Sequence, residues 1–282
     1  MNIIKKIREG TDYLREKSGK LGKTAFVTGA IYLGTMAAGL DNTEAKELDI
    51  GVGIATQSIE MHDNLSGRRY YEANEGEDFD RDDIGKSISL KYSSELSETE
   101  NGKLDIYGKI THSRTSGSEE KTVEDSTFYN KQGLTMNADQ EYKLNETRPS
   151  LGVKYTLDTG SILDNVSVYG GLVAGFMNLE EDISYDFDEI YNEVTSETNI
   201  SGVGGGLEAG VEGKVNISDS FDLKLDFSAS SAEYDAEGNN REKTKYLEDG
   251  EQKVINIYDN FISMDDLQIG SAEARITGSF EF

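Results

Sequence analysis

The chain has 282 residues, with 54 acidic and 28 basic side chains and a formal net charge of -26. It contains no cysteine, which excludes a disulfide framework, a thiolate metal site and a cysteine nucleophile. The negative charge argues against nucleic acid as a partner, because phosphate binding needs clustered Lys and Arg. A mean hydropathy of -0.58 excludes a bundle of membrane helices but not a membrane β-barrel, whose apolar side chains occupy only every second position.

The first 45 residues differ in composition from the rest of the chain. Seven basic residues lie between positions 5 and 23, and an uncharged, mostly apolar run follows from Thr24 to Leu40. Small residues come next, and Thr43-Glu44-Ala45 forms a plausible cleavage pattern. This order predicts a secretory signal peptide over 1–45, with 46–282 as the mature domain. A retained membrane anchor and an amphipathic N-terminal helix are the alternatives.

From Glu47 onward the dominant period of apolar residues is two, which indicates half-buried β-strands. In the clearest run Leu207, Val211 and Val215 alternate with Glu208, Glu212 and Lys214. Most of the runs have about ten residues, the length needed to cross a bilayer as a tilted strand, and the shortest has six. Eight runs are present, at 48–57, 87–92, 104–110, 151–157, 166–176, 207–217, 221–230 and 273–282.

The connections between these runs alternate between short and long. Three are short, at 98–103, 158–165 and 218–220, and four are long and polar, at 62–85, 113–148, 180–202 and 233–266. An even strand number with this alternation predicts an all-β fold, a closed antiparallel transmembrane barrel with short turns on one side and four long loops on the other. An Asp-Gly turn within 243–258 leaves ten strands as an alternative, although a hairpin beyond the membrane is the preferred interpretation.

The pattern resembles the small eight-stranded outer-membrane barrels of the OmpA transmembrane-domain and OmpX type. The C-terminal segment ARITGSFEF carries this resemblance most clearly, with Ile276, Phe280 and Phe282 on one face. The resemblance implies a bacterial outer-membrane location, periplasmic turns, extracellular loops, and recognition of the last strand by the outer-membrane assembly machinery. It also implies contact with outer-membrane lipid and lipopolysaccharide. A soluble secreted barrel or sandwich, with the apolar face inward, is the alternative.

The polar face of the predicted strands carries balanced charge. An eight-stranded barrel has an interior just wide enough for side chains, and buried charges persist only when they are paired. We therefore predict an interior salt-bridge network. It comprises Lys91, Asp105, Lys109, Lys154, Glu208, Glu212, Lys214, Asp222, Lys224, Asp226, Glu273 and Arg275.

The four predicted long loops hold most of the excess negative charge. The segment 181–193 contains no base, and 77–85 places Asp78, Asp80 and Asp82 at alternate positions. Divalent cations bridging these acids, or bridging them to lipid phosphates, are therefore candidate partners. The spacing does not reproduce an EF-hand loop, so no specific metal site is predicted.

The sequence predicts a structural or surface-interaction protein that acts through acidic extracellular loops. A small ion-conducting pore is the first alternative. A lipid A-modifying enzyme is the second, because His112 precedes Ser113 and a triad with Asp125 would be required. No catalytic motif with family spacing is present, and no cofactor site is predicted, since phosphate-loop and dinucleotide fingerprints are missing.

Overall fold

The computed structural model describes residues 46–60, 83–99, 102–128, 131–159, 165–187, 193–218, 221–248 and 251–281. Within these ranges no helix is long and apolar enough to cross a membrane. The predicted signal peptide over 1–45 lies outside the described residues. The eight strands are β1 (Lys46–Glu60), β2 (Asp83–Thr99), β3 (Gly102–Phe128), β4 (Lys131–Asp158), β5 (Asn165–Phe187), β6 (Glu193–Ser218), β7 (Phe221–Glu248) and β8 (Glu251–Glu281).

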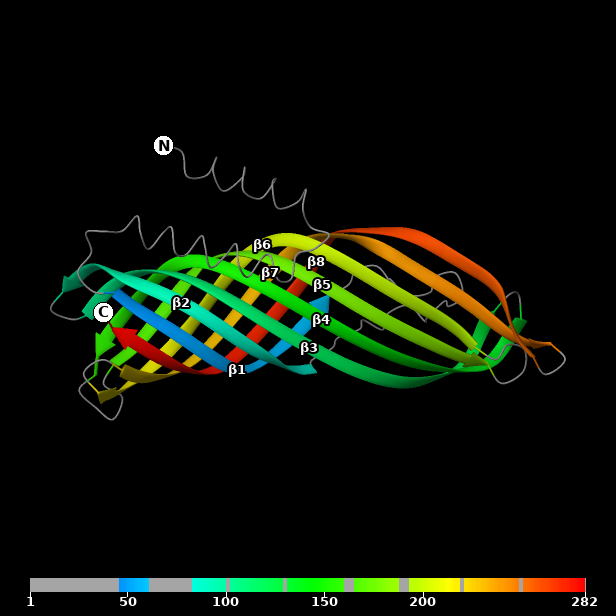
Figure 1. The fold of residues 1–282 in the computed structure, drawn as a ribbon, viewed down its shortest axis with the longest axis horizontal. Coiled ribbons are helices and arrows are strands. Elements are labelled where there is room, and N and C mark those ends of the chain that lie inside the picture. The colour runs from blue at the N-terminus through cyan, green and yellow to red at the C-terminus, as the bar shows by residue number, and fades with distance from the viewer. Residues whose placement is uncertain are drawn as a thin grey trace, which may run out of the picture.

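The strands form one closed antiparallel ring in sequence order, which confirms the predicted eight-stranded barrel (Figure 1). The ring closes where β8 pairs with β1, with Val52 opposite Ile276 and Glu47 opposite Glu281. The segment 243–258 belongs to the β7–β8 hairpin, so the ten-strand alternative is wrong. Closure pairs the backbone groups that an open sheet would expose to hydrocarbon, where each unpaired group costs several kcal/mol.

Six of the strands are far longer than the ten residues that the apolar runs predicted. Strands β3 to β8 contain between 23 and 31 residues, whereas β1 has 15 and β2 has 17. Most of the segments expected as loops at 113–148, 180–202 and 233–266 is therefore strand, and only 129–130, 188–192 and 249–250 separate the paired strands. Figure 1 shows β3 to β8 continuing well past the end of β1 and β2. The fourth predicted loop, 62–85, lies almost wholly outside the described residues.

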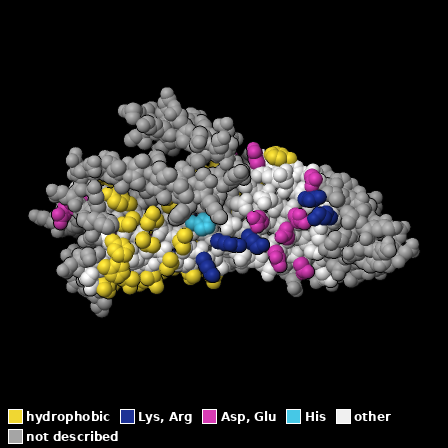
Figure 2. Space-filling model, in the orientation of Figure 1, with side chains coloured by type: hydrophobic (Ala, Val, Ile, Leu, Met, Phe, Trp, Pro, Cys, Tyr) yellow, Lys and Arg dark blue, Asp and Glu magenta, His cyan; other side chains and the backbone are white. Residues whose placement is uncertain are grey.

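One half of the barrel contains the short turns, the start of β1 and the end of β8, and we call it the lower half. Its outer surface is apolar. Leu172 is 69% exposed and Leu207 is 64% exposed, although neither is near a chain end. In Figure 2 hydrophobic side chains gather over one half of the visible face. We call this surface the apolar belt; its exposed members include Ile50, Val52, Ile54, Ile88, Val153, Val168, Leu172, Leu207, Leu225, Phe227 and Ile276.

Above the apolar belt the polarity of the two faces is reversed. Along β7 the outward positions change from Phe227 in the belt to Glu233, Asp235 and Glu237, all exposed. We call the part of β3 to β8 beyond the belt the extension. The reversal is the expected response to a change of surroundings from hydrocarbon to water, so it marks the upper edge of the membrane. The soluble alternative is wrong, because ring closure turns the charged face of the lower half inward.

A charged residue on the apolar belt should be costly only if the belt lies in lipid. We expect Leu172→Arg to lower the free energy of unfolding in vesicles by about 2–4 kcal/mol, the cost of an arginine near a bilayer midplane. Asn199→Arg is the matched control, because Asn199 is exposed on the extension, and it should change stability by less than about 0.5 kcal/mol. Urea titration of the vesicle-embedded barrel measures both, and equal effects would contradict the membrane boundary described above.

Candidate functional site

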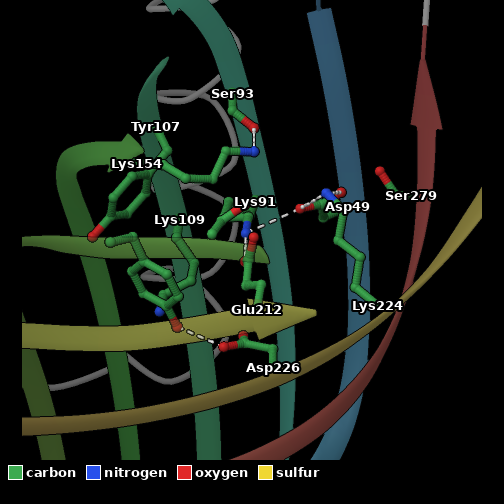
Figure 3. A network of polar contacts seen from close by, with 12 residues as sticks. Asp49, Lys91, Ser93, Tyr107, Lys109, Lys154, Glu212, Lys224, Asp226 and Ser279 are labelled. Atoms are coloured by element: carbon green, nitrogen blue, oxygen red, sulfur yellow. Dashed lines mark hydrogen bonds and ion pairs between the residues drawn. The ribbon is translucent and has the colours of Figure 1, made fainter. Parts of the chain in front are cut away.

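The lower lumen is filled by charged side chains that point inward from different strands. Lys224 on β7 reaches Glu47 at 2.7 Å and Asp49 at 2.9 Å, both on β1. Lys91 on β2 contacts the same Asp49 at 3.1 Å and also pairs with Glu212 on β6. Figure 3 shows Asp49 between the Lys91 and Lys224 side chains. Asp49 therefore serves two ammonium groups, and the contacts of Lys224 with β1 and of Lys91 with Glu212 connect strands that are not neighbours in the ring.

Lys154 extends this group toward β3. Its ammonium group lies 2.8 Å from Glu47, 3.3 Å from Asp105 and 3.4 Å from the Ser93 hydroxyl. Closer to the short turns, Lys214 pairs with Asp222 at 2.5 Å. The lumen at this level is therefore occupied by a continuous set of ion pairs.

A second group of ion pairs lies higher in the lumen and is centred on two arginines. The Arg275 side chain is fully buried and contacts Asp226 at 2.8 Å, the Ser228 hydroxyl at 2.7 Å, and Glu273. Arg148 contacts Glu273 as well, and Glu146 lies 3.6 Å from its guanidinium nitrogen. The two planar guanidinium groups thus share the Glu273 carboxylate, a geometry that suits the fork of Arg better than the point charge of Lys.

Two tyrosines complete this level by donating hydrogen bonds across the lumen. The Tyr107 phenol donates to Glu208 at 2.8 Å, and Glu208 also pairs with Lys109 at 2.5 Å. The Tyr169 phenol donates to Asp226 at 2.7 Å. The two tyrosine rings contact edge to face, with centroids 5.4 Å apart. The Tyr169 bond satisfies a buried oxygen of Asp226, and the Glu208 oxygen that accepts from Tyr107 also accepts from Ser150.

All twelve residues predicted for the interior network lie on the inward face, and each contacts an opposite charge. Eleven of them are buried, while Lys214 is half-buried near the short turns. The sequence reasoning missed four charged members, namely Glu47, Asp49, Glu146 and Arg148. Asp49 stood on the polar side of the first run, and Glu146 and Arg148 fell inside a segment interpreted as a loop. Their even spacing with Lys154 would have identified them as residues of the same inward face.

The lumen above the arginines is closed by apolar side chains. Leu144, Ile200 and Tyr234 are completely buried there, and they come from three different strands. The apolar plug, as we name this cluster, consists of Tyr142, Leu144, Met177, Leu179, Ile200, Ala232, Tyr234, Ala236, Leu267 and Ile269. Glu146 borders it, receiving hydrogen bonds from Gln57 at 2.6 Å and from the Tyr234 phenol. The inward face therefore changes from charged to apolar at the level where the outward face changes from apolar to polar.

A polar layer follows above the apolar plug. The Asn240 amide donates to Ser196 at 2.7 Å and to Thr198 at 2.8 Å. On the outer face at a similar level, Lys243 pairs with Glu197 at 2.7 Å, and this hydrogen bond holds the pKa of the Glu197 carboxyl below its ordinary value. The interior of the extension is thus ordered by hydrogen bonds as well as by apolar packing.

The histidine considered for catalysis does not meet its proposed partners. His112 points outward and its Nδ1 lies 3.0 Å from the Thr147 hydroxyl. Ser113 points into the lumen on the opposite face of β3 and interacts with Gln57. Adjacent strand residues point to opposite faces, so His112 cannot activate Ser113. The side chain of Asp125 lies outside what the structure describes. The same holds for all of His62, the other histidine of the chain.

Two further predictions concern cations and assembly. Among the described residues no group of three His, Cys, Asp or Glu side chains could hold a metal ion, and residues 77–82 lie outside them.

In the terminal strand, Ile276 and Phe280 point outward, and the Phe280 ring contacts Phe221 with centroids 5.3 Å apart. Phe282 is not among the described residues. Divalent-cation binding and recognition by the assembly machinery stay predictions.

Comparison with known proteins identifies likeness in fold only. No protein-family model and no curated protein sequence matches the chain. The attachment invasion locus protein Ail of Yersinia pestis is 16% identical over 84% of this chain and 99% of its own, with a TM-score of 0.35. Neisserial surface protein A is 14% identical over 85% and 99%, also with a TM-score of 0.35. The outer membrane protease OmpT of Escherichia coli is 10% identical over 86% and 97%, with a TM-score of 0.43.

The protein's own geometry carries the assignment of fold and location. A closed eight-stranded ring, an apolar belt around it and charges inside it confirm the resemblance to the small outer-membrane barrels. The chain is an integral protein of the bacterial outer membrane, and its strands cross that membrane eight times.

Proposed function

We propose that the protein is a non-conducting membrane anchor that displays a rigid acidic surface outside the cell. The observation that carries this proposal is the filled lumen, in which ion pairs occupy the membrane level and the apolar plug lies directly above them. Water and ions would have to separate buried pairs and then cross an apolar layer, and both steps are costly. A filled interior favours an anchoring role over the pore alternative.

The extension supplies the surface that the anchor would present. From Ser231 to Glu248, β7 continues beyond the belt, which corresponds to about 40 Å of height for a tilted strand. Its ladders with β6 and β8 are continuous apart from two bulges on the β8 side. A hydrogen-bonded sheet of this length holds its surface in one shape, and a partner would therefore lose little entropy in ordering it.

Acidic side chains dominate the outward positions of the described extension. Bases on this face are fewer, and two of them, Arg241 and Lys243, already face Asp259 and Glu197. The partner that fits such a surface carries positive charge, and its association should be faster at low salt. The exposed acids are Asp139, Glu141, Glu180, Asp182, Glu197, Glu233, Asp235, Glu237 and Asp259.

Single-channel recording of the refolded protein in a planar bilayer tests the closed lumen. We expect no conductance steps, because the ion pairs and the apolar plug block the path. The variant Leu144→Ser with Ile200→Ser is the comparison, since it removes two buried apolar side chains of the plug while leaving the charged layer intact. Stable steps from the wild-type protein would contradict the anchoring role and favour the small pore.

Binding to immobilised poly-lysine tests the surface role. Neutralising the row on β7 with Glu233→Gln, Asp235→Asn and Glu237→Gln should weaken binding at low salt and leave folding unchanged, because all three side chains are exposed. The comparison variant neutralises three other acids of the same surface, with Asp139→Asn, Glu141→Gln and Asp182→Asn on β4 and β5. Equal loss in both variants would indicate a diffuse charge effect, and no loss in either would contradict the proposed surface.

A further inference from the structure

A cross-strand pair of like charges stands on the outer face of β2 and β3, just above the apolar belt. Lys86 and Arg114 are directly opposite in the β2–β3 register, and both side chains are exposed on the outward face. Directly opposite residues have Cβ atoms about 4.5–5.5 Å apart. Lys143 on β4 faces outward as well, opposite Ser116 and therefore diagonal to Arg114. Three cations from three adjacent strands thus share one small area.

These cations lack the acidic partners that other outward bases have. In the part of the chain that the structure describes, no ion pair joins Lys86, Arg114 or Lys143 to a carboxylate, whereas Lys243 lies 2.7 Å from Glu197. The outward acids nearest the group are Glu180, which lies opposite Lys143, and Glu141, the next outward residue of β4. Like charges directly opposite on a sheet destabilise it, so an anion placed between Lys86 and Arg114 would remove an unfavourable interaction.

Exposed isoleucines surround the Lys86–Arg114 pair. Ile54 lies directly opposite Lys86 on β1, and Ile84 and Ile88 are the next outward residues of β2 on either side. These three side chains are 54%, 70% and 47% exposed respectively. In Figure 2 Lys and Arg side chains lie where the hydrophobic patch ends, and acidic side chains together with further Lys and Arg follow along the extension. The surface is therefore cationic at the level of lipid headgroups and apolar at the level of acyl chains.

From this arrangement we infer that Lys86, Arg114 and Lys143 bind the phosphate of a phosphorylated glycolipid in the outer leaflet. The guanidinium fork of Arg114 suits two phosphate oxygens, and the ammonium groups of Lys86 and Lys143 add point charges on either side. The acyl chains lie along the belt below, against residues such as Ile54 and Ile88. The acids farther along the extension, among them Asp139 and Glu141 on β4, repel phosphate, which confines binding to the edge of the apolar belt on β2, β3 and β4.

Native mass spectrometry of the refolded barrel in a non-ionic detergent tests the inference, with diphosphorylated lipid A as the probe. The wild-type protein should bind it, and dephosphorylated lipid A should bind at least about tenfold more weakly, since the charge-assisted bonds to phosphate are lost. The double variant Lys86→Gln, Arg114→Gln should lose about tenfold or more in affinity for the diphosphorylated form. Lys86→Arg with Arg114→Lys should retain most of it.

The matched control is Lys243→Gln with Arg241→Gln, which removes the same charge from outward positions of the extension. It should bind diphosphorylated lipid A as the wild type does. Heat-modifiable migration on a detergent gel shows whether each variant is folded. The inference is overturned if both double variants lose affinity equally, if Lys86→Gln with Arg114→Gln binds normally while folded, or if the wild type does not discriminate phosphorylated from dephosphorylated lipid. Inorganic phosphate at the same concentration as lipid A should not displace it; if it does so completely, the acyl contacts contribute nothing and the lipid assignment fails.

Discussion

Replacing Arg275 by Met should lower the free energy of unfolding by about 3–5 kcal/mol, the cost of breaking a buried ion pair by removing one partner. The Arg275 side chain is 0% exposed and donates to Asp226 at 2.8 and 3.0 Å, to Ser228 at 2.7 Å, and to Glu273. Its removal leaves two carboxylates with reduced compensation in a region without bulk water. Methionine keeps an unbranched apolar stem in place of the aliphatic part of arginine, so the lost guanidinium group accounts for most of the effect.

Urea unfolding of the barrel in lipid vesicles measures this change. Because the chain has no tryptophan, the folded fraction is followed by far-ultraviolet circular dichroism and by heat-modifiable gel migration. Arg241→Met is the control, since its guanidinium group is 49% exposed and 3.5 Å from Asp259, and it should cost less than about 1 kcal/mol. Adding Asp226→Asn and Glu273→Gln to Arg275→Met should recover part of the loss. If Arg275→Met and Arg241→Met cost the same, the lumen is hydrated and the network does not stabilise the barrel.

Replacing Tyr234 by Ala should have a comparable effect, with a loss of about 3–5 kcal/mol for a large aromatic side chain in a core. Tyr234 is 0% exposed, belongs to the apolar plug and donates its phenol hydrogen bond to Glu146. Two separate losses are therefore combined, a cavity in the plug and a buried carboxylate with one donor fewer. Tyr234→Phe causes only the second loss, the missing hydrogen bond to Glu146, and it should cost about 1–3 kcal/mol.

The place of the Tyr234 ring depends on a glycine of β5. A Cβ atom built on Gly175 would collide with the Tyr234 ring and its phenol oxygen, so only glycine leaves room for the ring. Gly175→Ala should therefore cost about 1–3 kcal/mol through overpacking, and this cost should fall in the Tyr234→Ala background. The control is Gly205→Ala on β6, whose Cβ would meet its nearest atom, the Val173 carbonyl oxygen, at 3.5 Å. An unchanged cost for Gly175→Ala in both backgrounds would contradict the contact.

The apolar runs of the sequence located the membrane-crossing part of every strand. Alternation in 207–217 assigned Glu208 and Glu212 to one face and Leu207 and Val211 to the other, as the structure has them. This assignment succeeds because successive side chains of a strand point to opposite faces, whatever the strand pairs with. The order of strands followed from short connections, which favour pairing between neighbours.

The extension was missed because its polarity is reversed. Between Tyr142 and Lys154 the inward residues change from apolar to charged while the strand continues without interruption. A search for apolar residues on the lipid side ends where Asn145 and Lys143 begin to face outward, although the period of two persists. Following the period of two, without requiring the apolar residues to stay on the lipid side, would have extended β4 toward Lys131.

The amino-acid sequence by itself determined which residues alternate, how many strands cross the membrane and that the charged residues of those strands lie on the inner face. Only the tertiary structure decided that Lys224 meets Asp49 across 175 positions of sequence, that Arg148 joins Arg275 at Glu273, and that Lys86 stands beside Arg114 on the outside. Periodicity is a local property of one strand. Partners across a lumen depend on register and on ring closure, which are set by all eight strands together.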